Sequence, residues 1–425
     1  VKDLLRFIDN SPTAYQAVEN SANILLNNGF RELELSSPWC LKESSKYFVR
    51  KNNSALVAFI TAADKVIEKG FRIIAAHTDT TGLKIKPNPE MIQEKRYLKL
   101  NTEVYGSPIL DTWFDRPLAL AGRLSYPGDN PLKPLYKLIN INKPLFIIPG
   151  LAIHMKSEEK KVDRQKHLLP LCSVIEEGHA EEEFLMNLLS KETGIRADQI
   201  IAYDLFLYEY KQAELIGANN EFISAGRLDD LAMVHAALNS LVRAEANDTV
   251  LMVVLFDNEE VGSSTGQGAD SPFLANILER ILMGSGASRE EYFCALANSF
   301  LISADMAHAL HPNFPETADP TNRAYLNGGP VIKISANYRY TSDSYSTAVC
   351  KQLCKKADIP YQIFVNHSEQ RGGSTIGPIL ASQLDIRSVD IGNPLLAMHS
   401  IRELAGVNDH LYMARLFETL YNLPG

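Results

Sequence analysis

An apolar run from Thr249 to Phe256, TVLMVVLF, stands out along the chain because it ends abruptly at the polar residues 257–260, DNEE. A run of this length, rich in Val and Leu, predicts a strand buried on both faces of a parallel sheet. Glu259 and Glu260 then follow the carboxyl end of the strand, the edge at which open α/β sheets bind ligands. The pair is therefore a candidate site, the alternative being two solvated acids at the start of a loop.

Other apolar runs also end at residues of types that commonly serve as metal ligands. Residues 73–76 precede His77 and Asp79, SFLISA precedes Asp305, and the run RSVDIGNPLLAMHS delivers His399. In FISAGRLDDLAMVHAALNSLVRA, apolar residues at three- and four-residue spacing predict a helix that starts near Asp229. Each residue alone has a structural alternative, a hydrogen-bonded core histidine or a helix-capping carboxylate. This alternation of strands and helices predicts an α/β fold.

The spacing of hydrophobic residues and the frequency of Pro and Gly divide the chain into two parts. Helical patterning covers residues 2–28, and two strand-like runs follow at 47–50 and 56–60. Between Lys84 and Asn220, Pro and Gly punctuate short alternating runs, which predicts a separate β-rich unit. Inside this unit we expect a helix over 180–189 and a solvated loop in the charged tract 156–166. The expected domains are thus 1–83 with 221–425, and 84–220.

Composition narrows the class of protein. The chain has 425 residues, which favours two domains, and its net charge of −9 without a dense Lys/Arg block gives no reason to expect nucleic acid as a partner. Five scattered cysteines indicate reduced thiols and a cytoplasmic setting, and Cys350 and Cys354 are expected on one helix. The first residues contain no signal-peptide core, and no apolar run approaches the roughly 20 residues that span a bilayer, so we expect no membrane partner.

Taken together, the candidate residues provide two imidazoles and several carboxylates. Such a set suits a pair of zinc-like ions. Adjacent acids can divide the work, since Glu260 can bind a metal while Glu259 stays unligated and accepts a proton from the attacking water. The set consists of His77, Asp229, Glu259, Glu260, Asp305 and His399.

Seven motifs in order resemble the M18 family of metalloaminopeptidases, which includes the aspartyl aminopeptidases. They are AAHTDTTGLKIKP, LDTWFDRPLALAGR, AGRLDDL, FDNEEVGS, SADMAHALHPN, GGSTIGPILAS and AMHSIRELAG, and they span nearly the whole chain. The resemblance implies a three-layer α/β/α zinc-peptidase catalytic domain with an inserted β-rich dimerisation domain. Asp230 is a departure, because aspartyl aminopeptidases have AGRLDN at this place.

The resemblance also implies roles for individual residues. Asp229 would bridge two divalent ions, most simply Zn²⁺, with Co²⁺ or Mn²⁺ as alternatives, and the Asp229–Asp230 peptide would be cis. The remaining expected ligands are His77 and Asp305 for one ion, and Glu260 and His399 for the other. Glu259 would be the general base, and Asp79 would orient His77.

Substrate and assembly are further implications of the resemblance. The substrates would be short peptides, and Lys333 and Tyr340 would meet an acidic N-terminal side chain. A preference for neutral residues, or a carboxypeptidase or deacylase with the same metal cradle, remains an alternative. His154 would cross a dimer interface to complete the neighbouring active site, within a tetrahedral homo-oligomer, a dodecamer.

Overall fold

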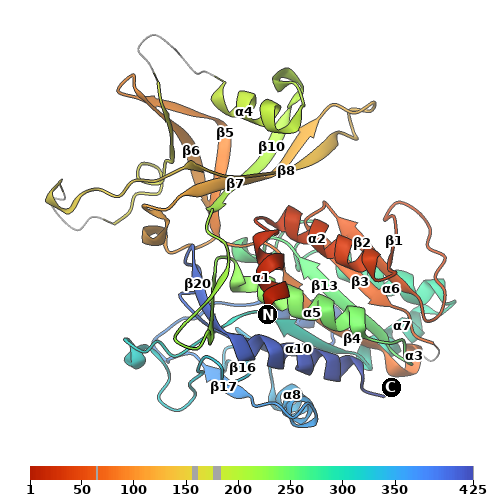
Figure 1. Cartoon of the computed structure of the whole chain (residues 1–425). Helices are drawn as coiled ribbons and strands as arrows, with labels where there is room; N and C mark the ends of the chain where they lie inside the picture. Colours follow the sequence, from red (N-terminus) through yellow and green to blue (C-terminus); the bar gives the residue numbers. More distant parts are fainter. Residues whose placement is uncertain (64–65, 156–160, 176–182, 425) are drawn as a thin grey trace. The chain divides into compact units, whose positions relative to one another are not determined.

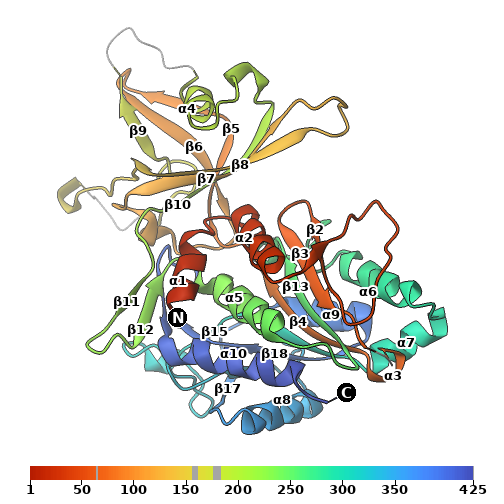
Figure 2. The ribbon, with the colours of Figure 1, turned by 45° about the vertical axis from the view of Figure 1, so that its right-hand side comes forward.

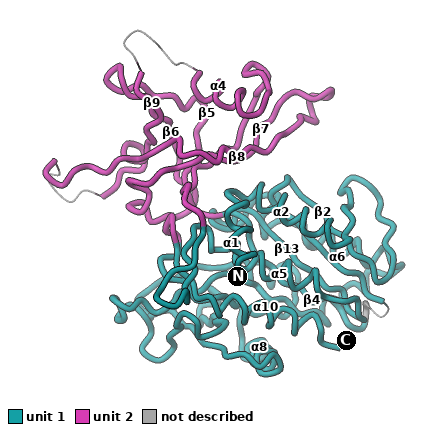
Figure 3. Tube along the Cα trace, viewed as in Figure 1, with its two compact units in different colours: residues 1–79, 213–398, 403–425 teal, residues 80–212, 399–402 magenta. Residues whose placement is uncertain are grey.

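The computed structural model describes residues 1–63, 66–155, 161–175 and 183–424. Two compact units are present (Figure 3). Unit 1 contains residues 1–79, 213–398 and 403–425, and unit 2 contains residues 80–212 together with the short segment 399–402. No helix in the described part of the chain is both long and apolar enough to cross a membrane.

Unit 1 is built on a nine-stranded sheet with the order β1-β2-β3-β13-β4-β14-β18-β16-β17 (Figure 1). At its centre, β13 pairs in parallel with β4, and β4 pairs in parallel with β14. β13 is antiparallel to β3, so the expectation of a parallel sheet around this strand is wrong on one side. The strands are β1 Arg31–Glu32, β2 Lys46–Lys51, β3 Ala55–Ile60, β4 Phe71–His77, β13 Val250–Phe256, β14 Phe300–Ala304, β16 Val331–Ile334, β17 Gln362–Val365 and β18 Arg387–Gly392.

Helices cover both faces of this sheet, because alternate strand residues feed two separate cores. Ile74 and Ala76 of β4 pack into one core, and Ile73 and Ala75 pack into the other. The first core holds α1 Lys2–Asp9, α2 Ala14–Asn27, α5 Leu228–Arg243, α8 Ser344–Lys356 and α10 Val407–Tyr421. The second holds α6 Phe273–Gly284, α7 Arg289–Ala297 and α9 Ile376–Leu384 (Figure 2). The expected three-layer α/β/α architecture is confirmed.

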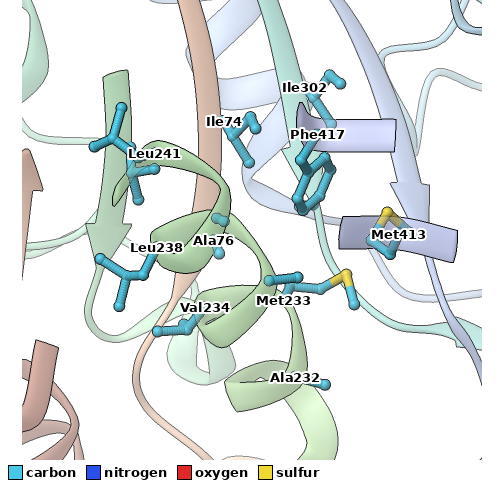
Figure 4. Close-up of a cluster of buried hydrophobic side chains, with 14 of the residues drawn as sticks. Ile74, Ala76, Ala232, Met233, Val234, Leu238, Leu241, Ile302, Met413 and Phe417 are labelled. Carbon is cyan, nitrogen blue, oxygen red and sulfur yellow. The ribbon is translucent and has the colours of Figure 1, made fainter. Parts of the chain in front are cut away.

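The core under α5 shows why these sequences form helices. Val234, Leu238 and Leu241 of α5 lie at three- and four-residue spacing on one side of the helix, and Met233 points to the other side, toward Met413 and Phe417 of α10 (Figure 4). Cys350 and Cys354, one turn apart on α8, are buried in the same core, as expected. The short helix α3 Val66–Lys69 precedes β4.

A second, five-stranded sheet lies in unit 1, with the order β11-β12-β20-β19-β15. Its strands are β11 Glu214–Ile216, β12 Phe222–Ala225, β15 Ala307–His308, β19 Pro394–Leu396 and β20 Glu403–Gly406. β12 leads directly into α5 and pairs with β20, so residues far apart in the sequence meet at the start of that helix.

Unit 2 is a six-stranded antiparallel sheet with the order β8-β7-β10-β5-β6-β9. Its strands are β5 Gly82–Gln93, β6 Tyr97–Tyr105, β7 Leu118–Tyr126, β8 Leu135–Phe146, β9 Leu171–Val174 and β10 Ala202–Glu209. The helical elements are α4 Phe184–Thr193, η1 Leu110–Trp113, η2 Ile153–Met155 and η3 Ala197–Gln199. Residues 156–160 of the expected solvated loop and 180–182 of the expected helix lie outside the described residues.

Candidate metal centre

The candidate residues of unit 1 gather where three neighbouring strands end. His77 is the last residue of β4, Asp305 follows β14, and Glu259 and Glu260 begin the turn η4 Glu259–Val261 just after β13. Because β13 and β14 both pair in parallel with β4, which lies between them, the carboxyl ends of the three strands share one edge of the sheet. Asp229 reaches this edge from the first turn of α5.

Four buried residues form a group able to hold a cation. His77, Asp229, Asp230 and Asp305 each offer a ligand atom, and these atoms all lie within 4.8 Å of one another. Nε2 of His77 is 3.5 Å from Oδ1 of Asp229 and 4.0 Å from Oδ1 of Asp305. Asp229 also offers an oxygen within 4.8 Å of one from Glu260. Asp229 therefore belongs to two groups of candidate ligands.

The orientation of the His77 ring follows from its contact with Asp79. Nδ1 of His77 lies 3.0 Å from the main-chain carbonyl oxygen of Asp79. A carbonyl only accepts, so Nδ1 donates its hydrogen there and Nε2 points toward the carboxylates. The carboxylate of Asp79 is farther away, 3.5 Å from Nδ1.

The Asp79 carboxylate instead holds the two acids after β13. Its Oδ1 accepts the main-chain N–H of Glu259 at 3.1 Å, and its Oδ2 accepts that of Glu260 at 3.1 Å. Asp79 is buried, so these hydrogen bonds fix the backbone from which both acidic side chains project.

The start of α5 does not use its carboxylates as helix caps. Arg227 is the N-cap residue, without a side-chain capping hydrogen bond, and the Asp229–Asp230 peptide bond is cis. Oδ2 of Asp230 accepts the main-chain N–H of His77 at 3.1 Å, and Oε2 of Glu403 accepts that of Asp229 at 3.1 Å. The two aspartates are thus tied to β4 and β20.

Burial of so many acids together strongly shifts their protonation. The pKa of the half-buried Glu259 is raised to about 8, first because its surroundings desolvate the carboxylate and then because neighbouring carboxylates repel its charge. Burial and like charge also raise the pKa values of Asp230 and Asp305. Burial lowers the pKa of His77, but Asp230 and Asp229 outweigh it, so that pKa is raised well above its ordinary value. These residues fit a divalent cation, which would compensate the buried negative charge.

Lys333 of β16 is buried and already contacts the site. Its Nζ donates to the carbonyl oxygens of Asp305 at 2.8 Å and Met306 at 3.2 Å, and it lies 3.5 Å from Oδ2 of Asp305. Burial lowers its pKa, but Asp305 and Asp390 more than compensate and the pKa is raised. Nζ also lies 5.4 Å from the centre of the buried Tyr340 ring. Lys333 is therefore neither a surface residue nor on an edge strand, since β16 lies between β18 and β17.

Two expected site residues, His154 and His399, lie in unit 2. His154 is exposed in η2. Nδ1 of His399 lies 3.1 Å from the carbonyl oxygen of Ser107. By the argument used for His77, Nδ1 donates there and Nε2 is left as the acceptor.

Sequence patterns missed two residues of this centre. The sequence marks Asp230 as a departure from the family motif and not as a ligand, although its adjacency to an expected ligand is a usable signal. Glu403 lies within the motif AMHSIRELAG, but its contact with Asp229 depends on the pairing of β20 with β12 and could not be predicted from the motif.

The family model described as "Aminopeptidase I zinc metalloprotease (M18)" matches residues 7–421. A Clostridium novyi (strain NT) protein named "Probable M18 family aminopeptidase 2" is 54% identical, over 99% of this chain and 98% of its own length. A protein of the same name from Clostridium acetobutylicum is 52% identical, again over 99% and 98%.

Solved structures show the same fold. The chain of "Cryo-EM structure of the Ape4 and Nbr1 complex" superposes with a TM-score of 0.93 at 36% identity, covering 99% of this chain and 85% of that one. "Structure of S. cerevesiae mApe1 dodecamer" has a TM-score of 0.86 at 27% identity, covering 99% and 97%.

Proposed function

The chain belongs to the M18 family of zinc metallopeptidases and is a metalloaminopeptidase, and we propose that it hydrolyses the N-terminal residue from short peptides with two divalent ions. The observation that carries this proposal is that Asp229 belongs to two groups of candidate ligands, one with His77 and Asp305 and the other with Glu260. A carboxylate with two oxygens can serve both sides at once.

The proposed ligands divide into two sets around Asp229. His77 and Asp305 hold one ion, and Glu260 and His399 hold the other. His399 is four residues before Glu403, whose carboxylate accepts the main-chain N–H of Asp229, so the chain itself limits how far His399 can lie from Asp229. Zn²⁺ suits these nitrogen and oxygen donors, and Co²⁺ or Mn²⁺ are alternatives.

Glu259 moves the proton in the proposed reaction. Two ions, when bound, polarise the scissile carbonyl and make water more acidic. Glu259 accepts the proton of the attacking water on its carboxylate and delivers it to the leaving amine. Asp79 keeps Glu259 in place through the main-chain N–H, so the base is positioned without being a ligand itself.

A substrate panel tests this function directly. The metal-free protein is loaded with Zn²⁺, Co²⁺ or Mn²⁺ and assayed on aminoacyl anilides with free and acetylated α-amino groups. We expect hydrolysis only of the free amines and only with metal. Equal hydrolysis of the acetylated substrates would indicate a carboxypeptidase or deacylase with the same metal cradle.

Acidic N-terminal residues are the proposed preference. Lys333 places a buried positive charge beside Asp305 and Tyr340, and an apolar substrate side chain would gain nothing from that charge. A preference for neutral residues is the second candidate, favoured by the hydrogen bonds that Nζ of Lys333 already makes to the carbonyls of Asp305 and Met306. Tyr340 would line the same pocket.

The proposed assembly is a homodimer formed through unit 2, within a larger tetrahedral homo-oligomer. Unit 2 exposes large apolar side chains, with Leu132 89%, Ile153 78% and Met155 71% accessible. His154 lies between the last two, which suits a residue that reaches a neighbouring active site. The similar chain from S. cerevesiae was solved as a dodecamer. We place the enzyme in the cytoplasm, in line with its five free cysteines.

A further inference from the structure

The loop that carries His399 has an unusual backbone. It joins β19 to β20, and two of its residues that are not glycine adopt left-handed conformations, Ala397 with φ 56° and His399 with φ 67°. Such conformations are sparsely populated and persist only where surrounding contacts impose them. The contacts around residues 399–402 therefore decide where the imidazole lies.

Those contacts come from unit 2, and the first of them are made by residues in and just before η1. The main-chain N–H of Ile109 donates to the carbonyl oxygen of His399 at 2.8 Å, while Nδ1 of His399 donates to the carbonyl of Ser107. Two residues on, the N–H of Ile401 donates to Oγ1 of Thr112 at 3.1 Å. The Ile401 side chain is buried in the apolar core of unit 2.

Arg402 fastens the other end of the segment. Its Nη1 lies 3.0 Å from Oε2 of Glu209, at the end of β10, and its Nη2 donates to the carbonyl of Gln212 at 2.9 Å. The side chains of Arg402 and Glu209 are only 10% and 5% exposed, so solvent screens this pair little. Arg116 holds the other oxygen of Glu209, which leaves the carboxylate little freedom.

We propose that unit 2 sets the position and the tautomer of His399, with Thr112, Glu209 and Arg402 as positioning residues for the ion that His399 binds. This inference rests on the proposed function, which makes His399 a ligand. The Ser107 carbonyl takes the Nδ1 hydrogen and leaves the Nε2 lone pair for the ion. Thr112 and Arg402 hold the backbone on either side of Ile401. Neither the ligands of the other ion nor Glu259 depend on these contacts.

Metal titration of the metal-free protein tests this proposal without an activity assay. Zn²⁺ binding is measured in competition with a chromophoric chelator for the wild type, Arg402→Leu and Thr112→Val. We expect both variants to bind one ion with the affinity of the wild type and the other about 10- to 100-fold more weakly. If Arg402→Leu does not fold, Thr112→Val decides, because it preserves shape while removing the acceptor for Ile401.

The matched control is another arginine–carboxylate pair of unit 2. Nη2 of Arg123 on β7 lies 2.9 Å from Oδ2 of Asp204 on β10, the strand that also carries Glu209. Arg123→Leu should bind both ions as the wild type does. An equal loss in Arg123→Leu would mean that general loosening of unit 2 weakens the ion, and would overturn the positioning role.

His399→Ala separates failure of this inference from failure of the proposed function. If this variant loses one ion while Arg402→Leu and Thr112→Val keep both at wild-type affinity, the positioning role is wrong and the ligand assignment stands. If His399→Ala itself binds two ions as the wild type does, His399 is not a ligand and both proposals fail.

Discussion

At the scale of single residues, the neighbouring acids Glu259 and Glu260 illustrate how one backbone can support two roles. The carboxylate of Asp79 accepts both main-chain N–H groups, one on each oxygen. With the backbone fixed there, the two side chains leave it in different directions and need not compete for one position. The proposed division between a proton carrier and a ligand depends on this arrangement.

Glu259→Gln should separate the two roles. An amide cannot accept the proton, so turnover should fall by about 10²- to 10⁴-fold, while metal content stays near that of the wild type. Metal analysis and steady-state kinetics on the same preparation measure both quantities. Glu260→Gln is the control, because it should lose metal. The opposite pattern, with metal lost from Glu259→Gln, would mean that the two acids have exchanged roles.

Lys333→Met should change the ranking of substrates. Loss of the buried ammonium should lower kcat/KM for Asp or Glu substrates at least about tenfold more than for Leu substrates. The quantity to compare is the ratio of kcat/KM for acidic substrates to kcat/KM for Leu substrates. Lys333 also contacts Asp305, and a loss of activity through Asp305 would affect both substrates equally and cancel in this ratio. An equal decrease on both substrates would make Lys333 a support for Asp305 and favour the neutral-residue alternative.

Several of these residues were visible in the sequence for a simple physical reason. His77, Asp305 and the acids at 259–260 each follow an apolar run long enough to mark a buried strand, so their place at one sheet edge could be predicted. Asp230 was hidden by the expectation of a helix cap. Glu403 and the carbonyl of Asp79 act through contacts that depend on strand pairing and chain direction, which no local pattern encodes.

At the scale of elements, α5 and α10 pack side by side and share a buried pair of histidines. Nδ1 of His235 lies 3.0 Å from Nε2 of His410, and both side chains are buried. Burial lowers the pKa of His235 to about 4, although Asp3 of α1 opposes this, and burial beside His235 lowers the pKa of His410 well below its ordinary value. Both imidazoles are therefore neutral in the folded protein at neutral pH.

This pair should make the protein sensitive to mild acid. In the unfolded chain histidine binds a proton near pH 6.5, whereas His235 in the folded protein resists protonation until about pH 4. Its contribution to stability is therefore fully present above pH 6.5 and is lost as the pH falls toward 4. For His235 the loss amounts to about 3 kcal/mol. Urea unfolding of wild type and His235→Asn between pH 7 and 4.5 measures this loss, and the variant, which lacks the shifted imidazole, should show a shallower pH dependence. His167→Asn, a control at an exposed histidine, should follow the wild type; identical slopes in all three proteins would contradict the assignment.

The alternation of elements was also largely predictable, with one exception at the centre. The helices after β12 and the strand ends were expected, whereas the antiparallel pairing of β13 with β3 was not. An apolar run buried on both faces looks the same whichever way its neighbour runs, so the sequence pattern could not distinguish the two arrangements.

At the scale of the whole molecule, the proposed role of His154 makes activity depend on assembly. His154→Phe should keep both metals and the oligomer but lose about 10²- to 10³-fold in turnover, the effect of removing one donor to a developing oxyanion. Mixing it with Glu259→Gln protein should restore part of the activity, because a mixed dimer contains one site with both residues intact. Size-exclusion chromatography checks that the subunits exchange. Full activity in a dilute, demonstrably monomeric preparation would contradict the role of His154.

The short alternating runs with frequent Pro and Gly distinguish a β-rich segment from the rest of the chain, but this pattern could not show that residues 399–402 pack with that segment. They lie far beyond its end in the sequence, and the contacts of Ile401 and Arg402 show that they belong to unit 2. From the sequence alone, residues 399–402 would be assigned to the same domain as β19 and β20, the strands on either side of them.

That membership sets a limit on protein engineering. A domain inserted into a loop is ordinarily modular, so that it can be excised and the ends rejoined to give a smaller enzyme. Excision of residues 80–212 would here also remove Ser107, Thr112 and Glu209, which hold the segment with His399. A minimal catalytic domain would therefore need a redesigned loop between β19 and β20.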